Sequence, residues 1–179
     1  MSVPTFIVTG PVGVGKTTVA DEMAYALRDA KVPHATIDFD RLRACYPRPA
    51  EDDRWGNKIG LTNLAAVWKN YQAAGARRLL IACVIEKRSD LDGFREAVPG
   101  ADILVVRLRA TPETLQARVR KRSHGTRMEW DLNRAVELAA LMDAEPVEDM
   151  LVDTEDRDPP TIARDVLQRA GWLPTYGSN

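Results

Sequence analysis

The sequence predicts an α/β fold in which a parallel sheet of five strands is covered by helices on both faces. Short apolar runs alternate with segments of helical periodicity along the chain, as in successive βαβ units. Residues 79–85, LLIACVI, are apolar without a break, which is typical of a strand buried on both faces. A glycine-rich segment links the first apolar run to a helical pattern. At 179 residues, the chain is expected to form a single domain, residues 1–179.

The glycine-rich segment, residues 10–17 (GPVGVGKT), matches the phosphate-binding P-loop or Walker A pattern GxxxxGK[ST]. It lies between an apolar run at residues 6–8 and a predicted helix at 16–29, the context that the pattern requires. Glycines let backbone N–H groups turn toward phosphate oxygens, and the positive end of the following helix adds to that field. Lys16 is expected to reach the β- and γ-phosphates, and Thr17 to bind Mg²⁺. The residues expected to bind the nucleotide here are Gly10, Val12, Gly13, Val14, Gly15, Lys16, Thr17 and Thr18.

Two aspartates follow the second predicted strand, residues 35–37. Asp38 and Asp40 are two residues apart, so in a continued strand they share one face at the carboxyl end of the sheet, where open α/β sheets bind ligands. Asp40 has an alternative interpretation as the N-cap of a helix that begins near Arg41. Both interpretations of Asp40 stay open at the level of the sequence.

Glu86 follows the apolar strand at residues 79–85. An acid at this place can help to hold Mg²⁺ or orient a nucleophile, and the alternative is a solvated strand end. Helical and strand patterns continue to alternate after residue 56. The other predicted elements are helices at 57–74, 90–97, 112–122, 131–144 and 161–170, and strands at 103–108 and 150–152.

The predicted helix at residues 112–122 ends in a cluster of basic side chains. Arg118 and Arg122 are four residues apart and share a helix face, so both can contact one polyanion. A solvated basic face is the alternative, but beside a P-loop we favour a lid, at about residues 118–130, that clamps phosphates. The cations of this cluster are Arg118, Arg120, Lys121, Arg122 and Arg127.

The composition is that of an ordinary globular protein, with 45% hydrophobic and 28% charged residues. The net charge of -1 gives no general attraction to nucleic acid, so a polynucleotide partner is not expected. No apolar stretch reaches the roughly 18 residues needed to span a bilayer, and the N-terminal residues do not have the pattern of a signal peptide. We therefore expect a cytoplasmic protein without a membrane partner; the sequence does not indicate its oligomeric state.

The order of elements, together with the P-loop, resembles the P-loop small-molecule and nucleotide kinases: adenylate kinase, shikimate kinase, gluconate kinase, chloramphenicol phosphotransferase and adenylylsulfate kinase. Residues 37–43, IDFDRLR, look like the LDGDNVR pattern of adenylylsulfate kinase, with Asp38, Asp40 and Arg43 in the matching places. Phe39 replaces the glycine of that pattern. The resemblance implies a three-layer P-loop NTPase fold with a short arginine-rich lid.

The resemblance also implies an ATP- and Mg²⁺-dependent phosphotransferase, a kinase that moves the γ-phosphate to a small hydroxyl-bearing acceptor. Asp38 would accept or orient the acceptor proton. Arg122, together with Arg127, would close over the transferred phosphoryl group. Arg118 and the segment that begins at Asp153 would lie near the adenine.

The acceptor region implied by the resemblance is residues 38–60, in which Asp40 and Arg43 contact the small-molecule acceptor and Glu86 lies at the edge. Two alternatives stay open. One is a P-loop ATPase that hydrolyses ATP, with Glu86 orienting water. The other is a polynucleotide 5′-hydroxyl kinase, for which Trp55 and the basic cluster are the candidate contacts.

Overall fold

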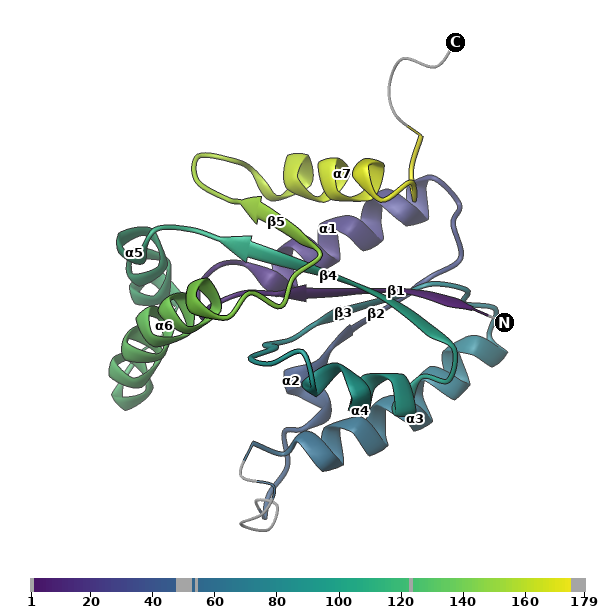
Figure 1. Ribbon diagram of the computed structural model, residues 1–179, viewed down its shortest axis with the longest axis horizontal. Coiled ribbons are helices and arrows are strands. Elements are labelled where there is room, and N and C mark those ends of the chain that lie inside the picture. The colour runs from purple at the N-terminus through teal and green to yellow at the C-terminus, as the bar shows by residue number, and fades with distance from the viewer. Residues whose placement is uncertain (1, 48–52, 54, 123, 175–179) are drawn as a thin grey trace.

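Five parallel strands form one sheet in the spatial order β2-β3-β1-β4-β5 (Figure 1). The computed structural model describes residues 2–47, 53, 55–122 and 124–174. The central strand β1 pairs with β3 on one side and with β4 on the other, so that Ile7 lies level with both Ile81 and Val105. The strands are β1 (Val3–Thr9), β2 (Ala35–Asp38), β3 (Leu79–Ala82), β4 (Ala101–Arg109) and β5 (Met150–Asp153).

Helices cover both faces of this sheet, with α1 and α7 on one face and α3 and α4 on the other (Figure 1). Helices α5 and α6 form a hairpin beside the carboxyl ends of the strands (Figure 1). The predicted three-layer α/β fold is therefore confirmed. The helices are α1 (Lys16–Asp29), α2 (Phe39–Leu42), α3 (Asn57–Ala73), α4 (Asp90–Ala97), α5 (Pro112–Arg122), α6 (Thr126–Ala144) and α7 (Pro159–Arg169).

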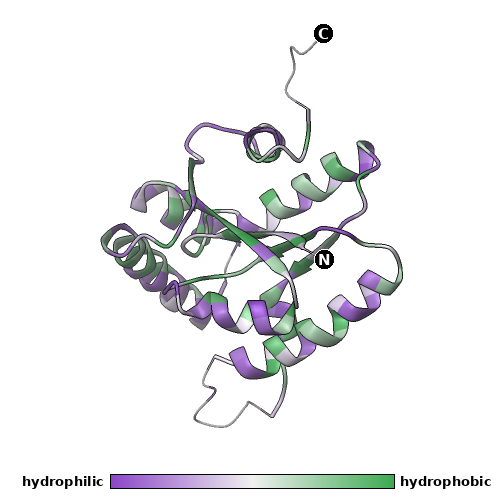
Figure 2. Ribbon diagram, turned by 45° about the vertical axis from the view of Figure 1, so that its right-hand side comes forward, coloured by the Kyte–Doolittle hydropathy of each residue, from purple (hydrophilic) through white to green (hydrophobic). Residues whose placement is uncertain are grey.

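Each face of the sheet has its own hydrophobic core. Phe6 and Val8 of β1 pack with α1 and α7, whereas Ile7, between them, packs with α3 and α4. This alternation follows from the two-residue period of a strand. Hydrophobic residues accordingly concentrate along the strands and the inner helix faces (Figure 2).

Of the predicted boundaries that differ from the structure, two lie beside the cleft. Helix α6 begins at Thr126, five residues before the expected start at residue 131, so the predicted lid region consists largely of the two helices α5 and α6. Strand β3 ends at Ala82, although the apolar run continues to Ile85. The chain still follows β1 beyond that point, because the N–H of Ile85 donates to Thr9 Oγ1 at 2.9 Å.

Parts of two predicted regions, residues 48–52 and 54 of the acceptor region and Ser123 of the lid, lie outside the described residues. Across the ranges that the structure describes, no helix combines the length and the apolar character needed to cross a membrane.

Candidate active site

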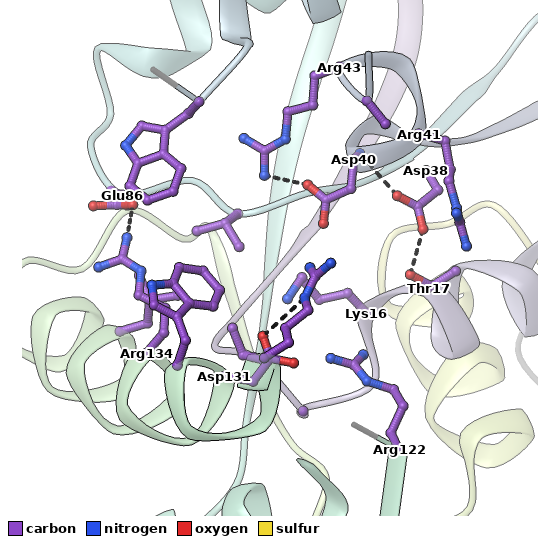
Figure 3. A pocket seen from close by; sticks show the side chains of 18 of the residues that line it. Lys16, Thr17, Asp38, Asp40, Arg41, Arg43, Glu86, Arg122, Asp131 and Arg134 are labelled. Atoms are coloured by element: carbon purple, nitrogen blue, oxygen red, sulfur yellow. Dashed lines mark hydrogen bonds and ion pairs between the residues drawn. The ribbon is translucent and has the colours of Figure 1, made fainter. Parts of the chain in front are cut away.

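A cleft of about 980 Å³ opens at the carboxyl edge of the sheet (Figure 3). The glycine-rich loop, the segment around α2, the segment after β3 and the α5–α6 hairpin all contribute to its wall. Four residues expected at the site do not line the cleft: Gly10, Val14, Arg118 and Asp153. The residues expected there that do line it are Val12, Gly13, Gly15, Lys16, Thr17, Thr18, Asp38, Asp40, Arg43, Glu86, Arg122 and Arg127.

The glycine-rich loop has the backbone that its sequence predicts. Gly10, Gly13 and Gly15 have φ angles of 143°, 86° and 102°, which L side chains rarely adopt. A Cβ atom added to Gly10 would lie 2.5 Å from the carbonyl oxygen of Leu108, so only glycine fits against β4. Gly15 is the N-cap of α1, and no side chain caps this helix end. The N–H groups of its first turn are therefore available to an anion in the cleft.

Lys16 lies folded into this loop. Its Nζ atom donates to the carbonyl oxygens of Gly10 at 2.9 Å and Pro11 at 3.1 Å. Burial lowers the pKa of Lys16 to about 8, and the charge of Asp40 opposes this shift. The ammonium group is thus held where phosphate oxygens would meet it, at a cost in solvation that an anionic ligand would reduce.

Asp38 connects the end of β2 to the loop. One carboxylate oxygen accepts the backbone N–H of Asp40 at 3.0 Å and caps α2, while the other accepts the Thr17 hydroxyl at 3.0 Å (Figure 3). The alternative interpretation of Asp40 as the N-cap is wrong, because α2 begins at Phe39 and Asp40 lies inside its first turn. Thr17 and Asp38 together present the oxygen ligands that suit Mg²⁺.

Asp40 and Arg43 form an ion pair beside Asp38 (Figure 3). The other guanidinium nitrogen of Arg43 donates to Asn57 Oδ1 at 3.0 Å, which joins α2 to the start of α3. The two predicted acceptor contacts are therefore brought together in the cleft, with their charges already paired to one another.

Glu86 faces α6 rather than the glycine-rich loop. Its carboxylate forms an ion pair with Arg134 of α6 (Figure 3), and Arg134 also reaches Glu137 at 2.8 Å. Sequence reasoning missed Arg134, and also Trp130, which lines the cleft one turn earlier. The available signal was the four-residue spacing of Trp130, Arg134 and Leu138, which places all three on one helix face.

The lid cations occupy different positions. Arg118 donates to the Val14 carbonyl at 3.3 Å and to the Thr154 hydroxyl and carbonyl at 3.1 Å each, so it ties the loop to the chain after β5. Asp153, at the end of β5, lies 3.3 Å from Arg109. The Arg127 Nε atom lies 3.7 Å from the buried carboxylate of Asp131.

Arg122 is exposed at the end of α5 and lines the cleft (Figure 3). Its guanidinium has no hydrogen bond or ion pair to the residues that the structure describes. Its positive charge is close enough to Lys16 to lower the pKa of that group. Two cations therefore lie at the part of the cleft formed by the glycine-rich loop.

These features define a P-loop α/β protein, and comparison with known structures narrows the class. A gluconokinase from Sinorhizobium meliloti matches with a TM-score of 0.61 and 25% sequence identity, over 96% of this chain and 93% of that chain. A sugar kinase from Janibacter sp. matches with a TM-score of 0.64 and 22% identity, over 99% of both chains. Shikimate kinase from Acinetobacter baumannii, solved with shikimate, matches with a TM-score of 0.57 and 18% identity, over 96% of this chain and 94% of that chain.

The chain thus has the fold of the P-loop small-molecule kinases, as its resemblance implied. No protein-family model matches the sequence, and no curated protein matches it.

Proposed function

We propose that this protein is an ATP- and Mg²⁺-dependent phosphotransferase that moves the γ-phosphate of ATP to a hydroxyl group of a small acceptor. The observation that carries the proposal is the 3.0 Å contact between Thr17 and Asp38, which joins the glycine-rich loop to a carboxylate of the second strand within one cleft. A phosphate-binding loop and an acid at the same place are what a donor and a hydroxyl acceptor require.

The chain's own residues would mainly position groups and neutralise charge, because phosphoryl transfer asks little covalent chemistry of a protein. Lys16 and the loop N–H groups would hold the phosphates, and Arg118 and Asp153 would lie on the adenine side. Thr17 would bind Mg²⁺, which supplies charge neutralisation when present. Asp38 would take the hydroxyl proton as the acceptor oxygen bonds to phosphorus and ADP leaves.

Arg122, with Arg127, would close over the transferred phosphoryl group. Both arginines lie on the α5–α6 hairpin and line the cleft, and the Arg122 guanidinium is exposed. Closure of such a hairpin would exclude water and limit wasteful hydrolysis.

Steady-state kinetics of Asp38→Asn tests the proposed role of this carboxylate. We expect turnover to fall about 10²- to 10⁴-fold, as for loss of a general base, while the affinity for ATP changes only a few-fold. Asp92→Asn is the matched control, since Asp92 is an exposed carboxylate paired with Arg95 on α4. Unchanged turnover in Asp38→Asn would contradict the assignment.

The acceptor assay measures ATP consumption with small hydroxyl compounds, nucleosides and 5′-hydroxyl oligonucleotides. Phosphorylation of a small acceptor is the expected result, and Lys16→Ala should abolish it. Hydrolysis that no acceptor stimulates would instead favour an ATPase. In the structure, Glu86 is ion-paired with Arg134, which makes it a poor candidate for orienting water.

A further inference from the structure

Two exposed tryptophans contact one another on the wall of the cleft. Trp55 lies two residues before the start of α3 and Trp130 lies on α6; each is 48% exposed and both line the cleft. Their ring centroids are 6.3 Å apart and the ring planes are inclined by 42°. We call this pair the indole wall. It joins the acceptor region to the lid and presents a large apolar surface among charged side chains.

The geometry of the indole wall limits how a ligand can use it. A flat ring inserted between two parallel rings needs about 7 Å, twice the van der Waals contact distance of about 3.5 Å. The indoles are closer than that and inclined, so a ligand ring stacks on the outer face of one of them. The Arg134 guanidinium already lies over Trp55, 6.0 Å from its ring centroid, and supplies a cation from the protein itself.

The charges of the cleft divide into two groups. Near the glycine-rich loop, the lining residues carry four cations (Lys16, Arg41, Arg43 and Arg122) and two carboxylates (Asp38 and Asp40), which leaves two positive charges in excess. This excess suits the phosphates of a nucleotide.

At the other end of the cleft, the charges of the described lining residues balance. Glu86 pairs with Arg134 there, and beside the loop Asp40 pairs with Arg43, so neither arginine is free for a ligand. Figure 3 shows the Glu86–Arg134 pair on the opposite side of the cleft from Thr17 and Asp38. Lys87 and Asp90 also line this end of the cleft, and the backbone N–H of Lys87 donates to the Asp90 carboxylate at 3.0 Å. An anionic acceptor would have to displace a carboxylate to pair with Arg43 or Arg134.

We propose that the acceptor is an uncharged alcohol that carries a ring with a flat apolar face, and that this face stacks on the indole wall. The proposal rests on the proposed phosphotransferase function of the cleft and specifies its acceptor. A nucleoside base and the apolar face of a pyranose both have this chemistry.

Calorimetric titration with four kinds of probe tests ring and charge separately, with the donor site saturated by a non-hydrolysable ATP analogue and Mg²⁺. Uridine and methyl β-D-glucopyranoside are uncharged rings, shikimate is a charged ring, erythritol is an uncharged open chain and gluconate is a charged open chain. We expect at least one uncharged ring to bind about tenfold or more tightly than shikimate, erythritol and gluconate. Whichever of uridine and methyl β-D-glucopyranoside binds more tightly shows whether the stacked ring is a base or a pyranose.

Substitutions of Trp130 test the wall itself. Trp130→Ala should weaken binding of the preferred ring about tenfold, and Trp130→Phe should restore most of that loss. Tyr71→Ala is the control, because Tyr71 is an exposed aromatic side chain on α3 that does not line the cleft. Circular dichroism establishes that each variant is folded.

Three results would overturn the proposal. The first is that shikimate or gluconate binds more tightly than both uncharged rings, and the second is that neither uncharged ring binds at millimolar concentration. The third is that Trp130→Ala binds the ring as tightly as the wild-type protein. Failure of the phosphotransferase function has a different signature, since the ATP analogue would then fail to bind or would bind equally to Lys16→Ala. Normal, Lys16-dependent binding of the analogue together with any of the three results removes only the acceptor assignment.

Discussion

Lys16 is a residue whose protonation should change when a ligand binds. Its pKa is lowered to about 8 by burial, and phosphate charge in the loop would raise it again. Above pH 8 the free protein has largely lost this proton, so nucleotide binding must take one up and affinity must fall as pH rises through that range. Calorimetry at about pH 8.5 in buffers of different ionisation enthalpy should show proton uptake on binding, approaching about one proton at higher pH.

The control for this experiment is Lys16→Arg, whose guanidinium stays protonated throughout. Uptake in the variant equal to that in the wild-type protein would assign the proton to another group. Affinity of the wild-type protein that stays constant between about pH 8 and 10 would contradict the link between Lys16 and the phosphates.

Gly13 tests the packing of the loop against α5. A Cβ atom at this position would lie 2.9 Å from both the Leu115 carbonyl oxygen and a Val119 methyl group, whereas a Cβ at Gly75 would meet nothing within 4 Å. Both glycines have positive φ, so alanine adds backbone strain of about 1–2 kcal/mol at either site. Gly13→Ala should cost about 1–3 kcal/mol more than Gly75→Ala in urea unfolding, because of overpacking. Equal losses of stability in the two variants would show that α5 shifts to accommodate the added methyl group at no cost in free energy.

Residues close in sequence were predictable and pairs distant in sequence were not. The loop glycines, Lys16 and Thr17 are adjacent, so local pattern alone identifies them. Glu86 and Arg134 lie 48 residues apart, and only the docking of α6 beside the segment after β3 brings them together. Asp38 was placed at the site, but its second role as the cap of α2 depended on where β2 ends.

At the scale of elements, Arg107 of β4 anchors the end of α6. Its side chain is 3% exposed and reaches the Met142 carbonyl, Asp143 and the largely buried Glu148. Arg107→Ala would leave Glu148 without its buried partner, so we expect a loss of about 3–5 kcal/mol in the free energy of unfolding. Urea unfolding measures the loss.

An exposed ion pair provides the comparison for Arg107. Arg95 and Asp92 of α4 have 48% and 71% exposed side chains, so Arg95→Ala should cost at most about 0.5 kcal/mol. Similar losses in the two variants would mean that the Arg107 network does not hold α6 to the sheet.

Helices with an apolar stripe were predicted closely, and the start of α6 was not. Helix α3 begins at the expected residue 57. Its buried face includes Leu64 and Trp68, which are four residues apart, so helical periodicity identified this helix in the sequence. The first turn of α6 is polar and follows a run of cations, so periodicity could not locate its start at Thr126.

At the scale of the molecule, the strand order sets the two sides of the cleft. The sequence predicted a parallel sheet but not the order β2-β3-β1-β4-β5, because pairing between distant strands leaves no local pattern. With β1 central, the loop after β1 lies between the segments after β2 and β3, which carry Asp38 and Glu86, and the hairpin that follows β4. The segments after β2 and β3 and the α5–α6 hairpin therefore lie on opposite sides of the glycine-rich loop, at the carboxyl edge where open α/β sheets bind ligands.

Ligand-dependent stability tests this whole arrangement. A nucleotide that binds only the folded protein stabilises it by about 2.7 kcal/mol at 100 times its dissociation constant, which raises the Tm of a domain of this size by about 5–10 °C. If Thr17 holds Mg²⁺ beside the phosphates, removal of the metal with EDTA at constant ATP should abolish most of that rise. Lys16→Ala should lose it with or without metal, whereas Arg95→Ala should keep it. A rise that is independent of Mg²⁺ would contradict the metal role of Thr17, and a rise preserved in Lys16→Ala would place the nucleotide outside the loop.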